Sequence, residues 1–333
     1  MGFTTPRRGA VALAVALAGL CLTVAACGGD DDSSSSSSGG GGGGKNYKLT
    51  LLAGVKGDEF YITMNCGAQE EAKKEGVSLD FQGPDQFDAT LQTPIVNAIA
   101  AKKPDALLVA PTDSKAMYAP IKQVADGGAK VVLVDTTLDQ ADFAVSQIAS
   151  DNEAGGRAAA QALAKLIGGK GKVFVNNVKP GISTTDLRAK GFEDEAKKLG
   201  LTFVGVQYND DDPAKAASVV NGVLAKNPDL KGIFATNLFG AEGSATALRQ
   251  SGKQGKVKIV GFDAGPKQVQ DLKDGIVQGL IAQKPATIGA DGVQQAYNAL
   301  TGKPVTKKIA TGSVSLTKAN LSQNSQFEYK AHC

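Results

Sequence analysis

Polar and aromatic side chains follow five of the apolar runs in this 333-residue sequence. They are Asp58, Phe60, Tyr61, Asp135, Thr136, Asn237, Asp263 and Gln283. Carboxylate and amide groups exchange hydrogen bonds with a polar ligand, and aromatic rings supply an apolar contact face. Any single loop Asp or Asn is explained equally well as a helix N-cap. Five such loops in one chain favour a ligand-binding site.

The sequence argues against several other kinds of chemistry. Its one histidine is His332, next to the last residue, so a His base, a His-paired nucleophile and a multi-His metal site are excluded. The formal charge is +3, and about +1 without Arg7 and Arg8, which is far from the basic surface that nucleic-acid binding needs. We predict no catalytic residue, no metal, no cofactor and no nucleic-acid partner.

The elements that must position these side chains alternate between two periods from residue 48 onward. Short apolar runs predict buried parallel strands at residues 49–53, 78–81, 106–110, 131–135, 172–175, 202–206, 232–235, 258–261 and 279–282. Helical spacing of apolar residues predicts helices between them, among them residues 59–75, 88–101, 154–167 and 186–199. This alternation predicts an α/β fold with parallel sheets. The carboxyl ends of the strands, and the side chains that follow them, then share one edge of each sheet.

The first 46 residues are predicted to form a targeting signal followed by a tether. Arg7 and Arg8 precede an apolar run that ends in Val-Ala-Ala-Cys at Cys27, which has the order of a secretory signal and resembles a bacterial lipoprotein box. Residues 1–27 are therefore predicted to be a lipoprotein signal with a lipidated Cys27, and an uncleaved membrane anchor is the alternative. Residues 28–46 are rich in Gly, Ser and Asp and predict a flexible tether. Both interpretations place the rest of the chain outside the cytoplasm.

Several short motifs follow one another in a fixed order. They are Pro-Thr-Asp-Ser at 111–114, Ala-Ser-Asp-Asn at 149–152 with Gly-Gly at 155–156, Gly-Phe at 191–192, Val-Gly-Phe-Asp at 260–263, and Leu-Ile-Ala-Gln at 280–283 with Pro285 and Ile-Gly at 288–289. In this order and spacing, the chain from about residue 48 to residue 313 resembles the ribose-type periplasmic sugar-binding proteins of ABC importers.

The resemblance implies a type I periplasmic binding fold, in which two similar doubly wound parallel-sheet lobes are joined by a three-strand hinge and close on a sugar. By position, residues 47–149 with 284–311 would form the N-terminal lobe, residues 150–283 the C-terminal lobe, and residues 312–333 a tail that crosses the hinge. Phe60 and Tyr61 match the aromatic pair that packs on the sugar ring. Positions that bind the sugar hydroxyls are matched by Asp135, Asn237, Asp263 and Gln283.

Three positions depart from the family pattern. Thr136 and Asp186 stand where the ribose proteins carry arginines, and Asp58 stands where Asn is usual. Arg188 lies two residues beyond Asp186 and faces another direction on a helix, so it is not taken as a replacement. The pocket would then hold the carboxylates of Asp58, Asp135, Asp186 and Asp263. We expect such an acidic pocket to reject sugar acids and sugar phosphates. In the alternative, Asp186 faces solvent at the start of its helix.

The resemblance also implies a function. It indicates a monomeric, lipid-anchored protein on the outer face of the cell membrane that delivers a neutral sugar or polyol to the permease of an ABC importer. A ligand-sensing lobe for a chemotaxis or signalling receptor stays open. A repressor of the same two-lobe fold needs a DNA-binding motif where this chain has a signal and tether. A glycoside hydrolase using Asp135 and Asp263 needs one acid kept neutral in an apolar pocket, whereas these residues follow strands among polar partners.

The cysteines predict one disulfide. Cys21 lies inside the signal and Cys27 is the lipidation site, which leaves Cys66 and Cys333 in an oxidising compartment, where an even pair usually bonds. The tail after residue 313 could return across the hinge to the helix that carries Cys66. We predict a Cys66–Cys333 disulfide, with two free thiols as the alternative.

Overall fold

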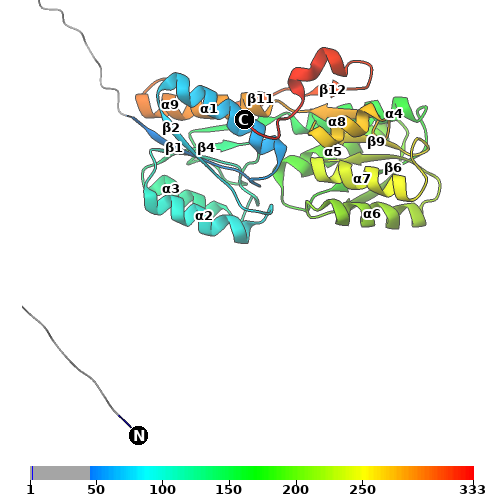
Figure 1. Ribbon diagram of the computed structural model, residues 1–333, viewed down its shortest axis with the longest axis horizontal. Coiled ribbons are helices and arrows are strands. Elements are labelled where there is room, and N and C mark those ends of the chain that lie inside the picture. The colour runs from blue at the N-terminus through cyan, green and yellow to red at the C-terminus, as the bar shows by residue number, and fades with distance from the viewer. Residues whose placement is uncertain (1, 3–45) are drawn as a thin grey trace, which may run out of the picture. The chain divides into compact units, whose positions relative to one another are not determined.

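Two six-stranded sheets with helices packed on them form the part of the chain that the computed structural model describes in detail, residues 46–333. Gly2 is described as well. The rest of the predicted signal, with the lipidation site Cys27, and residues 28–45 of the predicted tether lie outside the described residues. The predicted α/β fold with two doubly wound, mostly parallel sheets is confirmed (Figure 1).

The first lobe is built on a parallel sheet of order β11-β5-β4-β3-β1-β2. Its strands are β1 Lys48–Leu52, β2 Ser78–Gln82, β3 Ala106–Val109, β4 Lys130–Val134, β5 Ser146–Ser150 and β11 Lys308–Thr311. Helices α1 (Glu59–Glu75) and α9 (Pro285–Thr301) pack together on one face, and α2 (Ala89–Lys102) and α3 (Tyr118–Asp126) cover the other (Figure 1).

The second lobe has a sheet of order β12-β10-β9-β8-β6-β7. Its parallel strands are β6 Lys172–Asn177, β7 Thr202–Tyr208, β8 Leu230–Ala235, β9 Lys258–Phe262 and β10 Gly279–Ala282, and β12 Val314–Leu316 pairs antiparallel with β10. Helix α4 (Asn152–Leu166) packs on α5 (Ser183–Lys198), and α6 (Pro213–Lys226) packs on α7 (Leu238–Gln250), next to α8 (Pro266–Lys273). The 3-10 helix η1 spans Leu321–Phe327.

Local sequence explains where these elements start and stop. Central strands such as β3 are apolar and buried along their whole length, as expected for a sheet covered on both faces. Asp58 caps α1 by accepting a hydrogen bond from the Phe60 amide at 2.7 Å, and Asn237 caps α7 in the same way through the Gly240 amide. Gly76, in the left-handed conformation, ends α1. The N-capping residues Asp58 and Asn237 therefore sit where strands give way to helices, at the carboxyl edge of each sheet.

Three of the observed strands were not predicted from the sequence. Strand β5 alternates polar and apolar residues, β11 is buried only at its last residue, and β12 has only three residues. None of them is a continuous apolar run, which was the signal used for strands. The antiparallel pairing of β12 also departs from an all-parallel sheet.

The chain passes between the two sheets three times, from β5 to α4, from β10 to α9 and from β11 to β12. The two lobes belong to one compact unit. Among the residues that the structure describes, no helix has the length and apolar character needed to cross a membrane.

Candidate functional site

A cavity lies between the two lobes, with about 410 Å³ of space not filled by protein atoms, counting the part that is open to solvent. The first lobe lines it with Asp58, Phe60, Tyr61, Phe87 and Asp135. The second lobe lines it with Val178, Ile182, Thr184, Thr185, Arg188, Asp211, Asn237 and Asp263, and Gln283 joins them from the crossing after β10. The wall thus combines aromatic rings, carboxylates, amides and one guanidinium group.

The structure brings together most of the residues selected from the sequence. Asp58, Phe60, Tyr61, Asp135, Asn237, Asp263 and Gln283 all line the cavity. Two predicted residues do not. The Thr136 hydroxyl is buried and donates to the Pro111 carbonyl at 2.7 Å. Asp186 is not among the residues that line the cavity, and its carboxylate accepts hydrogen bonds from the Gly181 amide at 2.9 Å and the Asn177 side chain at 3.3 Å.

The expectation that the pocket lacks an arginine is wrong. Arg188 lines the cavity and is only 3% exposed. Helix α5 begins at Ser183, three residues before the predicted start, and Asp186 is an acidic residue in its first turn. Arg188 lies three residues after Thr185 and four after Thr184, so the three side chains share one helical face, and that face lines the cavity.

Close packing of two helices fixes the position of Arg188. A Cβ atom built on Gly156 of α4 would lie 2.1 Å from the Arg188 carbonyl oxygen, and one built on Gly191 of α5 would lie 2.2 Å from the Glu153 carbonyl oxygen. Only glycine permits this approach of backbone to backbone. Arg188 then donates from Nε to Asn152 at 2.8 Å and from Nη1 to the Thr236 carbonyl at 2.9 Å, with its guanidinium 3.9 Å from the centre of the Phe262 ring.

Asp135 and Asp263 occupy equivalent places in the two lobes, each directly after a central strand. Tyr61 donates its hydroxyl to Asp135 at 2.7 Å, and Tyr329 donates to Asp263 at 3.0 Å. Both aspartates have positive φ, 63° and 79°, a conformation that Asp tolerates better than most residues and that gathers at functional sites. Each lobe therefore presents one carboxylate held by one tyrosine.

Sequence reasoning missed several residues of the wall. Asp211 follows β7 and binds Asn237 at 2.6 Å, and its signal was the Asn-Asp-Asp-Asp run that ends the predicted strand. Phe87 lies between β2 and α2, where no pattern marked it. The Thr185 hydroxyl is buried and makes no hydrogen bond to another described residue, so a ligand hydroxyl is a suitable partner for it.

Burial raises the pKa of every carboxylate in the cavity. The pKa of Asp135 rises to about 6, with Arg188 and the Tyr61 hydroxyl opposing the rise, and the pKa of Asp211 rises to about 7. The pKa of Asp58 is raised by burial and then by the charges of Asp211 and Asp263. Burial also raises the pKa of Asp263, against Arg188. Four carboxyl groups share one buried cation, so an anionic ligand would meet like charge wherever these groups are ionised.

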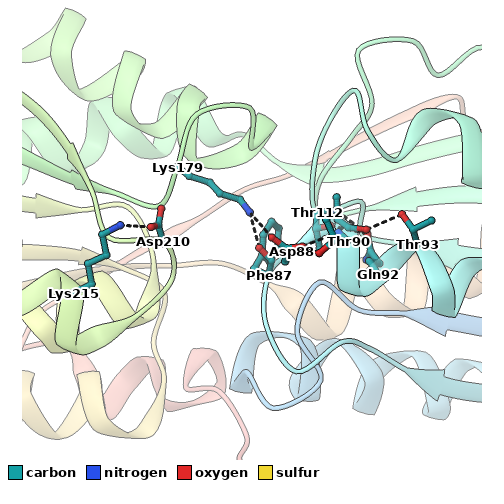
Figure 2. A network of polar contacts seen from close by, with 10 residues as sticks. Phe87, Asp88, Thr90, Gln92, Thr93, Thr112, Lys179, Asp210 and Lys215 are labelled. Carbon is teal, nitrogen blue, oxygen red and sulfur yellow. Dashed lines mark hydrogen bonds and ion pairs between the residues drawn. The ribbon is translucent and has the colours of Figure 1, made fainter.

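Direct contacts join the two lobes at Phe87, which lines the cavity. Lys179 of the second lobe donates to the Phe87 carbonyl at 2.8 Å and lies 4.0 Å from the Asp88 carboxylate of the first lobe (Figure 2). The Ser114 amide also donates to the Gly181 carbonyl at 3.3 Å. The lobes are therefore in a closed arrangement. No group of three or more Cys, His, Asp or Glu suited to a metal ion occurs among the described residues.

Comparisons with known proteins agree with this geometry. A profile of the family described as periplasmic binding protein domain matches residues 50–304. The ribose import binding protein of Bacillus subtilis is 32% identical over 266 residues, which cover 80% of this chain and 86% of the relative. A solute-binding protein of an ABC transporter from Agrobacterium vitis, solved with α-D-tagatopyranose, is 44% identical with a TM-score of 0.83, covering 85% of this chain and 99% of that one. A carbohydrate transporter solute-binding protein from Agrobacterium radiobacter, solved with D-arabinose, is 29% identical with a TM-score of 0.80, covering 84% and 97%.

Proposed function

This chain belongs to the periplasmic binding protein domain family, and we propose that it captures one monosaccharide between its lobes and delivers it to the permease of an ABC importer. The observation that carries the proposal is the interlobe cavity, which Asp135 and Asp263 line from opposite lobes. Each ionised carboxylate accepts hydrogen bonds from neighbouring hydroxyls, and charge-assisted bonds of this kind contribute about 1.5–3 kcal/mol each. Phe60, Tyr61 and Phe87 supply the apolar contact that a sugar ring needs.

A ligand panel tests the proposed function. The similar proteins point to D-tagatose, D-arabinose and D-ribose as first candidates, followed by other hexoses, pentoses, polyols and amino sugars. A neutral sugar should raise the melting temperature of the protein and give a measurable Kd by calorimetry. Sugar acids and sugar phosphates should give neither effect, because the cavity holds four carboxylates and one arginine. The proposal fails if no neutral sugar or polyol in the panel binds.

Closure of the lobes is the expected response to the ligand. The bonds to Asp135 and Asp263 form together only when the lobes approach, so a ligand shifts the population from open to closed. We expect the radius of gyration measured by small-angle X-ray scattering to fall when a saturating sugar is added. An unchanged radius would contradict the hinge.

Sugar affinity should depend on pH through the cavity carboxylates. With the pKa of Asp135 near 6 and that of Asp211 near 7, affinity measured by calorimetry should fall about tenfold from pH 7 to pH 5, as charged acceptors are lost. Ligand-free stability should change in the opposite direction. A raised folded-state pKa contributes stability that is present below about pH 4 and lost as the pH rises through 6. In Asp135→Asn, affinity and ligand-free stability should both depend less on pH than in the parent protein. If the pH dependence of this variant equals that of the parent, other groups are responsible for it.

We also propose that the protein acts outside the cytoplasm, held at the membrane by a lipid on Cys27, and that it binds its ligand without catalysing a reaction. The signal and the lipoprotein motif in the sequence support the anchor. Full-length protein should partition into detergent when expressed in a bacterium that processes lipoproteins, and Cys27→Ser should not. Incubation with aryl glycosides should release no product, and release of the aryl group would reveal a hydrolase.

A further inference from the structure

The C-terminal tail ends against the first helix of the first lobe. After β12 and η1 the chain returns to α1, where Figure 1 places the C-terminus. Cys66 of α1 and Cys333 form the predicted disulfide, with a Cα–Cα distance of 5.4 Å. The Lys330 amide donates to the Thr63 hydroxyl of the same helix at 2.7 Å. The last residues of the chain are therefore fastened to the first lobe by one covalent bond and one hydrogen bond.

The same short segment also binds the second lobe, through Tyr329. The Tyr329 amide donates to the Ala264 carbonyl at 2.9 Å. Its hydroxyl accepts from the Gln283 amide at 3.0 Å and donates to Asp263 Oδ1 at 3.0 Å. The ring lies 5.9 Å from the Phe60 ring, edge to face. One buried tail residue thus contacts three residues that line the cavity, Phe60, Asp263 and Gln283.

These contacts fix the orientation of the Asp263 carboxylate. Oδ1 accepts from both the Tyr329 hydroxyl and the Gln283 side chain, at 3.0 and 2.7 Å, so the plane of the carboxylate is set from two directions. Without the Tyr329 hydroxyl, the backbone amide of Gln283 would be buried with no hydrogen-bond acceptor, which costs free energy. Binding sites need their polar groups held within about 0.5 Å of the productive position.

We infer that Tyr329 is a positioning residue of the ligand site, which holds Asp263 and Gln283 in place, and that the Cys66–Cys333 disulfide keeps Tyr329 there. The disulfide at Cys333 and the hydrogen bond from the Lys330 amide to Thr63 hold the segment that carries Tyr329 against α1. The role of Tyr329 in affinity rests on the proposed function, whereas its effect on Gln283 can be measured without a ligand.

Tyr329→Phe is the direct test, because it removes one oxygen and keeps the ring against Phe60. With D-tagatose as the first probe, or the tightest sugar of the panel if D-tagatose does not bind, we expect a Kd about tenfold higher than that of the parent protein. Tyr47→Phe is the matched control, since it removes a hydroxyl bond to the Leu300 carbonyl and Tyr47 does not line the cavity. Its Kd should stay within about twofold. Equal Kd values for Tyr329→Phe and the parent would overturn the positioning role.

A double-mutant cycle separates the disulfide's role in binding from its role in stability. Cys66→Ser with Cys333→Ser should weaken binding about fivefold, and adding Tyr329→Phe should bring the total to about tenfold rather than about fiftyfold. This non-additivity is expected only if the disulfide acts through the Tyr329 hydroxyl. Multiplicative losses, or a lower melting temperature with unchanged Kd in the double Ser variant, would refute that link.

Hydrogen exchange decides the inference even if no sugar binds. The peptide that contains Gln283 should exchange its amide protons faster in Tyr329→Phe and in the double Ser variant than in the parent, because the Gln283 amide loses its acceptor. Tyr47→Phe should leave this peptide unchanged. If no sugar binds but exchange at the Gln283 peptide is faster in the variants, only the proposed function is contradicted. If exchange at this peptide is unchanged, the positioning role of Tyr329 is contradicted.

Discussion

Replacing either Asp135 or Asp263 by Asn is expected to weaken sugar binding by about 100-fold or more. Each carboxylate is buried at the end of a central strand and faces the ligand space. Losing two charge-assisted hydroxyl bonds at about 1.5 kcal/mol each amounts to about 3 kcal/mol, and each 1.4 kcal/mol is a factor of ten in Kd. Asn keeps an oxygen that can accept the hydroxyl of Tyr61 or Tyr329, so the local fold should survive.

The matched control for this prediction is Asp186→Asn. Asp186 was expected in the pocket from its sequence position, but its carboxylate binds the Gly181 amide and the Asn177 side chain instead. Its substitution should change the Kd by less than about threefold. Calorimetry on the three variants distinguishes the two assignments. A large loss in Asp186→Asn, or retained affinity in Asp135→Asn and Asp263→Asn, would mean that the ligand does not bind where the cavity lies.

Much of the fold was predictable because most of its elements carry strong local signals. Strands such as β3 are uninterrupted apolar runs, and the range predicted for α1, residues 59–75, matches the observed helix. The unpredicted strands β11 and β12 are edge strands and β5 lies next to β11, and all three contain partly exposed positions that dilute the apolar signal. Their pairing is decided by tertiary contacts that a window of sequence does not contain.

The site was predictable where it depends on strand ends and unpredictable where it depends on helix phase or distant contacts. Asp135 and Asp263 follow strands directly, so the rule for parallel sheets located them. Arg188 was misplaced because Asp186 was assigned to the cavity by its sequence position, whereas the face of α5 that lines the cavity carries Thr184, Thr185 and Arg188. Tyr329 reaches the site only because the tail crosses back to α1. There Cys333 bonds to Cys66, which lies 267 residues earlier in the sequence. Local patterns carry no information about such contacts.

Arg188→Met is expected to destabilise the ligand-free protein by about 3–5 kcal/mol at pH 8. The guanidinium is buried, and its removal leaves the Asn152 side chain and the Thr236 carbonyl without their donors. It also removes the cation that opposes the rise in the pKa values of Asp135 and Asp263. Breaking a buried charge network by deleting one partner typically costs this much, because the remaining charges stay buried and uncompensated. Urea unfolding monitored by circular dichroism measures the change.

Arg157→Met supplies the comparison, because Arg157 pairs with Glu153 at 3.0 Å and both side chains are more than a third exposed. A surface pair of this kind contributes at most about 1 kcal/mol, so this variant should unfold close to the parent. The pH dependence then separates charge from packing. Without Arg188, the pKa values of Asp135 and Asp263 should rise further, and protonation at pH 5 should restore part of the stability lost at pH 8. A deficit that is the same at both pH values would assign the loss to the cavity left by the side chain, and a deficit below 1 kcal/mol would show that the carboxylates do not depend on this arginine.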